Sequence, residues 1–167
     1  MSVMNFDDPR LTAMGLLAEV SAGLSARFQP VLSEARLSEI DFETVIRLAR
    51  SPGRRLRMSD LAAQTGLSTS GVTRVVDRLE REGLVARQAC ASDRRASYAV
   101  LTEAGRERLE SVLPRHLQDV DDCFTGLLEA AELEAFLGSL RKIRDVVRPC
   151  ATIGAEASVP SQPSLPG

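Results

Sequence analysis

The chain has 167 residues, of which 44% are hydrophobic, and this length suits one domain with a core of its own. Its net charge of −2 is unevenly spread, because residues 47–95 hold eleven arginines and five acidic residues, a local charge of +6, which leaves −8 for the rest. No segment has the apolar length of a membrane span or the basic start of a signal peptide, so we expect a cytoplasmic protein that does not enter a membrane.

The first predicted element is a helix over residues 9–31, preceded by a flexible N-terminus at 1–8. Pro9 and Thr12 can open this helix, and it is expected to end around Pro30. Its apolar side chains recur at spacings near three and four, on a stripe that holds Leu17, Val20, Leu24, Phe28 and Val31. A stripe of this length needs another apolar surface to cover it.

A second helix is predicted over residues 38–50. Ser38 can cap its N-terminus, and Glu39 and Asp41 in the first turn complement the helix dipole. The residues expected to point inward are Ile40, Phe42, Val45, Ile46 and Leu48. A Ser-Pro-Gly run at 51–53 ends the helix.

Two short helices joined by a tight turn, a helix-turn-helix, are predicted over residues 59–81. Ser59 can cap the first of them, and Gly66 ends it in the left-handed conformation. Ser68 or Thr69 can cap the second. The inward side of the second helix is expected to hold Val72, Val75, Val76 and Leu79.

The second of these helices, residues 70–81, is the predicted reader of DNA. In a helix-turn-helix its N-terminal turns enter the major groove, where hydroxyls contact base edges or phosphates and arginines bind guanine or phosphate. The residues expected to contact the major groove or its phosphates are Ser68, Thr69, Ser70, Thr73, Arg74 and Arg78.

Two paired strands, a wing, are predicted after Gly83, over residues 84–88 and 98–101, around a polar tip at 91–97. Adjacent arginines on a hairpin tip fit a minor groove, whose narrow segments concentrate negative potential, and a neighbouring aspartate can orient one guanidinium. The tip residues that we expect at the minor groove are Asp93, Arg94 and Arg95.

In their order and spacing, these segments resemble the MarR family of bacterial regulators. The resemblance is carried by Ser59-Asp60-Leu61-Ala62, Gly66-Leu67-Ser68, the run 72–80, Gly83-Leu84-Val85, Asp93-Arg94-Arg95 and Leu101-Thr102-Glu103-Ala104-Gly105. It implies a mainly α fold with a small β-wing (α+β), in which N- and C-terminal dimerisation helices flank the winged helix-turn-helix. It further implies a homodimeric repressor that binds a pseudo-palindromic operator in double-stranded DNA. A small aromatic or phenolic acid, bound among the first, second and fifth helices, would release the DNA.

Two further helices are predicted after the wing. Thr102 can cap a long one, which Pro114 is expected to bend, and another spans residues 132–147. The apolar stripe of the long helix holds Leu109, Leu113, His116, Val120, Cys123 and Leu127. The stripe of the helix at 132–147 holds Leu133, Phe136, Leu137, Leu140, Ile143 and Val147. The predicted organisation is one domain at 9–149, with the winged helix at 38–101, dimerisation helices at 9–31 and 102–148, and a disordered Ala/Ser/Pro/Gly-rich tail at 150–167.

The sequence offers little catalytic chemistry. Its one histidine, His116, lies on an apolar stripe, and the common nucleophile, zinc-protease and phosphate-loop motifs do not occur. Cys90, Cys123 and Cys150 are too scattered for a disulfide framework or a metal site. We therefore expect no enzyme activity, no cofactor and no metal. Two alternatives stay open, namely a regulator that responds to oxidation of Cys123, and a winged-helix module that binds protein instead of DNA.

Overall fold

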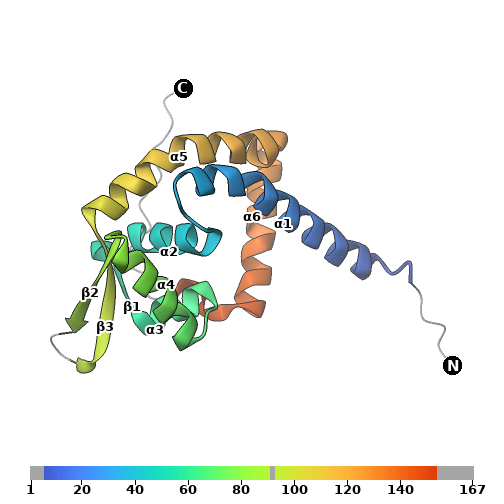
Figure 1. Ribbon diagram of the computed structural model, residues 1–167. Helices are drawn as coiled ribbons and strands as arrows, with labels where there is room; N and C mark the ends of the chain where they lie inside the picture. Colours follow the sequence, from blue (N-terminus) through green and yellow to red (C-terminus); the bar gives the residue numbers. More distant parts are fainter. Residues whose placement is uncertain (1–5, 91–92, 154–167) are drawn as a thin grey trace.

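Three helices and a small sheet form a winged helix-turn-helix in the computed structural model, which describes residues 6–90 and 93–153, apart from the side chains of 93–95. Helices α2, α3 and α4 pack beside a three-stranded antiparallel sheet of strand order β1-β3-β2 (Figure 1). The bounds are α2 Glu39–Ala49, β1 Arg55–Arg57, α3 Met58–Thr65, α4 Thr69–Arg81, β2 Val85–Cys90 and β3 Asp93–Leu101. This arrangement confirms the predicted fold class.

The core of this unit is apolar. Its largest fully buried apolar side chains are Val45, Leu48, Leu61, Val72, Val76, Leu79, Leu84 and Val85. All four residues predicted to point inward from α4 are buried, which confirms the helical register of that segment. Because the core fixes one side of α4, the opposite side is held in a defined orientation towards solvent.

The sheet has a third strand that the sequence did not predict. β1 pairs with β3, and Leu56 lies opposite Ala99 with both side chains buried. The flanking arginines, Arg55 and Arg57, are exposed. Since one apolar residue in a three-residue strand is too short a pattern to show period two, the sequence carried no usable signal for β1.

The wing hairpin is longer than predicted. β2 reaches Cys90 and β3 begins at Asp93, and these two residues are paired. The predicted polar tip at 91–97 is therefore mostly strand, and residues 91–92 lie outside the described part of the chain. Polar side chains can follow one another along a strand that is exposed on both faces, so polarity alone did not mark the end of pairing here.

Side-chain caps fix three helix starts at the predicted positions. The oxygens of Ser38, Ser68 and Thr102 accept the N–H groups of Asp41, Gly71 and Gly105 at 3.2, 3.1 and 3.0 Å. The predicted cap at Ser59 is wrong, because β1 runs directly into α3 and leaves Arg57 at the cap position. Gly66 ends α3 with φ +71°, the left-handed conformation that the tight turn requires.

Helix α1, Pro9–Glu34, continues through Pro30, where it was predicted to end. A proline inside a helix removes one hydrogen bond and costs about 3 kcal/mol. The next two residues, Val31 and Leu32, are the buried residues of α1, and burying two such side chains contributes about 3–6 kcal/mol. Packing of the last turn on the core therefore offsets the proline.

The two helices after the wing are α5, Glu103–Cys123, and α6, Ala130–Val147. α5 runs without interruption through Pro114 and ends at Cys123, so Leu127 lies in the 3₁₀ turn η2, Thr125–Leu127, and not on the helical stripe predicted for it. In α6, which is described over its whole length, no residue is buried. The N-terminal part of α1 projects away from the rest of the protein (Figure 1). No described helix is both long and apolar enough to cross a membrane.

The C-terminal turn η3, Pro149–Thr152, lies against α3. Ala151 is buried, and its carbonyl accepts a hydrogen bond from Arg47 Nη1 at 3.2 Å. Gln64 Nε2 donates to the carbonyl of Ile153 at 2.5 Å. The first residues of the predicted disordered tail are thus bound to the winged helix through their backbone, a contact that composition does not encode. Residues 154–167 lie outside the described part.

Candidate nucleic-acid interface

The first turns of α4 present hydroxyls to solvent. Ser68, Thr69 and Ser70 are exposed, and Thr73 is half-buried one turn later. The Oγ atoms of Ser68 and Ser70 lie 3.1 Å apart, and Thr73 donates to the carbonyl of Thr69 at 2.8 Å. Each hydroxyl can donate once and accept twice, so these contacts leave bonding capacity for a ligand on the outer side of the helix.

The structure divides the arginines of the basic segment, residues 47–95, into two groups. Four are bound to carboxylates: Arg47 to Glu43, Arg54 to Glu103, Arg78 to Asp41, and Arg87 to Asp77 and Glu80. Five have no ion pair within 4.0 Å in the described part of the chain: Arg50, Arg55, Arg57, Arg74 and Arg81. Only the second group adds its full charge to the surface, a division that counting charges along the sequence could not make.

Arg78, a predicted DNA contact, binds a buried carboxylate. Its Nε donates to Asp41 Oδ1 at 3.1 Å and its Nη2 donates to the same oxygen. The other oxygen, Oδ2, accepts the Ser38 N–H at 3.0 Å and the Ser38 hydroxyl at 2.6 Å. Asp41 is only 4% exposed. A DNA contact through Arg78 would compete with this ion pair, and leaving a buried carboxylate without its partner is strongly unfavourable.

The predicted minor-groove residues belong to the wing. Asp93, Arg94 and Arg95 begin β3, and their side chains lie outside the described residues. The pairing of Cys90 with Asp93 places this segment at the far end of the β2–β3 hairpin. The hairpin extends away from the helices of the winged helix (Figure 1).

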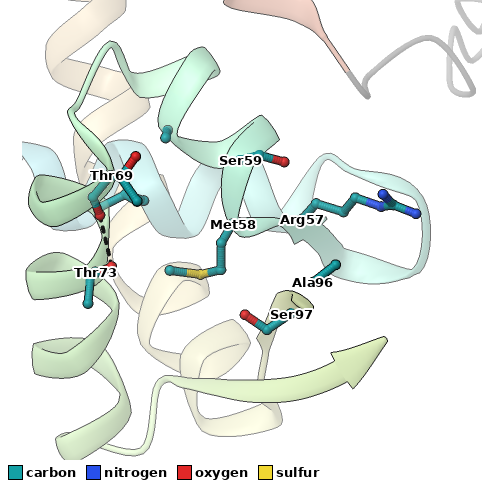
Figure 2. A pocket seen from close by; sticks show the side chains of 9 residues that line it. Arg57, Met58, Ser59, Thr69, Thr73, Ala96 and Ser97 are labelled. Atoms are coloured by element: carbon teal, nitrogen blue, oxygen red, sulfur yellow. Dashed lines mark hydrogen bonds between the residues drawn. The ribbon is translucent and has the colours of Figure 1, made fainter. Parts of the chain in front are cut away.

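A hollow of about 330 Å³ separates the start of α4 from β3. Figure 2 shows Thr69 and Thr73 on one side of it, Ser97 and Ala96 on the other, and Met58 between them. Its full lining is Arg57, Met58, Ser59, Ala62, Thr69, Val72, Thr73, Ala96 and Ser97. Arg57, Ser59 and Ser97 line this hollow but were not among the residues predicted to contact DNA, and the arginine cluster at 54–57 was the one sequence signal near them.

A second hollow, of about 210 Å³, lies between α1, α2 and α5. The ring of His116 lines it, with its centroid 4.7 Å from those of both Phe28 and Phe42. Its Nδ1 is buried and has no hydrogen-bond partner in the described part of the chain. Burial lowers the pKa of His116 below 6.5, and Asp119 opposes that shift. The ring is therefore neutral at neutral pH, and its buried Nδ1 is left without a hydrogen-bond partner among the described residues.

Cys123 and Cys150 are free thiols, and the described residues contain no group of side chains able to hold a metal ion. Cys90 is buried and Cys150 is exposed. Cys123 is half-buried, and its thiol donates to the carbonyl of Asp119 at 2.8 Å. The thiol that the redox alternative requires is thus engaged with the backbone of its own helix.

A sequence profile of the MarR family matches residues 37–96. AbsC, a MarR family transcriptional regulator from Streptomyces coelicolor, is 34% identical and superposes with a TM-score of 0.81 over 88% of this chain and 99% of AbsC. The chain belongs to the MarR family. The matched members of this family are transcriptional regulators.

Further proteins are similar to the chain in structure or in sequence. Sco3205 from S. coelicolor, solved in complex with DNA, is 26% identical with a TM-score of 0.79 over 89% of this chain and 93% of its own. BpsR from Bordetella bronchiseptica, whose DNA binding is regulated by 6-hydroxynicotinic acid, is 26% identical with a TM-score of 0.71 over 86% and 99%. The transcriptional repressor MprA of Escherichia coli is 33% identical over 84 residues, 50% of this chain and 48% of MprA. The chain spans about half the length of this and other curated relatives that it matches.

Proposed function

We propose that this MarR-family protein is a homodimeric repressor that binds a pseudo-palindromic DNA operator and releases it when a small aromatic acid binds. The observation that carries DNA binding is the solvent-facing edge of α4, where the hydroxyls of Ser70 and Thr73 lie beside the unpaired guanidinium of Arg74. A helix with this edge fits the major groove. The DNA complex of Sco3205 supports the same role for this chain.

The predicted contacts divide into readers and supports. We assign Thr69, Ser70, Thr73 and Arg74 to the major groove, with Ser68 both capping α4 and available to a phosphate. Arg78 holds α4 against the start of α2 through Asp41, and we assign it a positioning role. For Asp93, Arg94 and Arg95 the minor-groove assignment rests on the sequence argument and on their place in the hairpin.

The dimer is proposed from apolar surface on the terminal helices. Large apolar side chains are exposed along α1 and α6: Leu11, Met14, Leu16, Leu17, Val20, Phe136, Ile143, Val146 and Val147. Soluble monomers rarely expose so many large apolar side chains on two helices, and a two-fold interface between copies would cover both. A two-fold axis also explains why the operator should be a pseudo-palindrome.

The effector site is proposed at the cavity beside His116. The cavity lies between helices that would form the dimer and helices of the reading unit, so a bound ring can change how one is oriented to the other. At about 210 Å³ it suits a single aromatic ring, with Phe28 and Phe42 in its wall. The response of BpsR to 6-hydroxynicotinic acid supports this class of ligand. A ligand acts in this way only if it binds the DNA-free arrangement more tightly.

Arg36 is the proposed anchor for the carboxylate of such an acid. Of the three arginines near α1, Arg10 binds Asp8 and Arg27 binds Asp119, whereas Arg36 forms no ion pair in the described part of the chain. Arg36 lines a neighbouring hollow of about 650 Å³, which shares Leu32 and Glu39 with the cavity beside His116. An acid that bridges the two hollows would place its charge at Arg36 and its ring at the aromatic wall.

Footprinting on DNA enriched by in vitro selection tests the proposal. We expect protection of two half-sites whose centres lie roughly 10 bp apart, with an affinity that falls steeply with salt. Hydroxybenzoates should release the DNA, and Arg36→Gln should require a higher concentration of them. Protection of a single half-site would contradict the dimer, and no retention on DNA would favour the protein-binding module. Release by peroxide but not by hydroxybenzoates, abolished in Cys123→Ser, would establish the thiol alternative.

A further inference from the structure

The hollow between α4 and β3 lies where a DNA backbone has to pass if the proposed function holds. Neighbouring major and minor grooves of B-DNA are separated by one sugar-phosphate backbone. With α4 in the major groove and the wing in the adjacent minor groove, that backbone runs over the residues between the two elements. These residues line the hollow of about 330 Å³ (Figure 2).

The lining of the hollow is suited to phosphate. It combines four residues with hydroxyl groups, Ser59, Thr69, Thr73 and Ser97, with Arg57 at its edge, and none of its described lining residues carries a carboxylate. Hydroxyls and guanidiniums are among the groups that contact phosphate oxygens at protein–DNA interfaces. The side chain of Arg57 extends from the edge of the hollow on the side away from α4 (Figure 2).

Arg57 is held in place by the sheet. It lies opposite Tyr98 in the β1–β3 register, and its Nε donates to the Tyr98 hydroxyl at 3.4 Å. The guanidinium carbons of Arg55 and Arg57 lie 4.9 and 5.9 Å from the centre of the Tyr98 ring. Arg55 Nη1 also donates to Gln88 Oε1 at 3.3 Å. Both guanidiniums are thus oriented by an aromatic ring and neutral oxygens. Neither forms an ion pair within 4.0 Å in the described part of the chain, although the charge of Asp60 acts on Arg57 from further away.

We infer that Arg55 and Arg57 form a phosphate clamp that binds the DNA backbone between the two grooves, and that Tyr98 is the positioning residue that holds both. The inference rests on the proposed DNA binding and adds a third contact element, β1, to the recognition helix and the wing tip. Phosphate contacts carry no base information. The clamp therefore strengthens binding to any sequence, and it fixes how far α4 enters the groove.

The contrast with Arg87 makes the clamp testable. Arg87 lies on β2 of the same sheet, but its Nη1 is bound to Asp77 at 2.5 Å and to Glu80 at 3.1 Å. Arg57→Gln and Arg87→Gln therefore change the net charge equally, while only the first removes a free guanidinium. The measurement is fluorescence anisotropy with an operator duplex and a random duplex of equal length, from 50 to 300 mM KCl, with melting temperatures to check folding.

Arg57→Gln and Arg55→Gln should each weaken binding to both duplexes by the same factor, roughly five- to tenfold, and lower the slope of log K against log salt by about one. Arg87→Gln should keep the wild-type slope. Tyr98→Phe keeps both charges and the ring, so affinity should fall a few-fold while the slope stays unchanged, a split that a change in folding alone would not produce.

Two results would overturn the clamp. The first is a slope of log K against log salt that is the same for Arg57→Gln and Arg55→Gln as for the wild type, although Arg74→Ala loses operator binding. The other is an Arg87→Gln slope as low as that of Arg57→Gln, which would show that net charge alone is responsible. If Arg74→Ala and Thr73→Ala also bind both duplexes as the wild type does, the proposed function itself fails.

Discussion

The winged helix and the terminal helices use their apolar residues in opposite ways. In the winged helix, α2, α3, α4 and the sheet contribute fully buried side chains to one core, and Ser38 and Ser68 cap α2 and α4. In α6 no residue is buried, and Val146 is 82% exposed. α1 joins the core only through its last turn.

This difference separates what one chain can stabilise alone from what needs a second chain. The winged helix buries its apolar residues in its own core, so the residues on its exposed polar edge are not needed for folding and are available to bind a ligand such as DNA. The terminal helices have an apolar side that the single chain leaves exposed to water. Each Å² of apolar surface that stays exposed forgoes a burial free energy of about 25 cal/mol. We infer that regulation acts across the boundary between the two regions, where the cavity beside His116 and the contact of η3 with α3 both lie.

The largest effect is expected from a charge on the apolar side of α6. Ile143→Glu should raise the dimer dissociation constant on the order of 1000-fold, because a two-fold interface would bury the new carboxylate twice. Sedimentation equilibrium measures this constant. Lys142→Glu, the adjacent exposed position on the same helix, should change it little. Equal effects of the two variants would mean that α6 is not in the interface.

The winged helix should respond most to loss of Arg78. Arg78→Ala leaves the carboxylate of Asp41 buried with only Ser38 as a partner, so the free energy of unfolding should fall by about 3 kcal/mol. Urea titration followed by circular dichroism measures this. Arg144→Ala, which breaks the exposed pair with Asp145, should cost less than about 0.5 kcal/mol. If Arg78→Ala kept its stability but lost operator binding, Arg78 would be a DNA contact and not a positioning residue.

The edge of α4 should show smaller, sequence-specific effects. Arg74→Ala or Thr73→Ala should reduce discrimination between the operator and single-base variants by roughly 1–3 kcal/mol at particular positions. Competition binding with a panel of operator variants measures the position affected. A uniform loss over all variants would make these residues phosphate contacts and leave base readout to another element.

Much of the winged helix could be predicted because its signals are local. Ser38, Ser68 and Thr102 cap their helices, and Gly66 adopts the left-handed turn, since each feature depends on residues within one helical turn. The end of α1 was missed because packing of Val31 and Leu32 outweighs the local preference of Pro30. β1 was missed because its pairing partner lies more than forty residues away in sequence.

The residue types of the candidate interface can be read from the sequence, but the ion-pair partners of its arginines cannot. Sequence order placed Thr73, Arg74 and Arg78 on one helix, while the neutralisation of Arg78 comes from Asp41 on another. The same long-range pairing distinguishes Arg57, which is hydrogen-bonded to Tyr98 and forms no ion pair within 4.0 Å in the described part of the chain, from Arg87, which is paired with two carboxylates. Charge along a chain indicates that a polyanion binds, and three-dimensional pairing decides which charges are free to bind it.

The smallest expected effect is a pH dependence that originates at the boundary between the two regions. Burial lowers the pKa of His116 below 6.5, so the folded protein favours the neutral ring and the unfolded chain binds the proton more readily. The stability linked to this ring is therefore complete above pH 6.5 and is lost as the pH falls through the lowered pKa.

Asp8 and Glu103, whose arginine partners lower their pKa values from 3.8 and 4.5, change the stability only in more acidic solution. Urea unfolding between pH 7.5 and 5 thus isolates His116, and His116→Phe, which keeps a ring between Phe28 and Phe42, should flatten the profile. The same decline in His116→Phe as in the wild type would assign the pH dependence to another group and remove His116 as the titrating residue of the cavity.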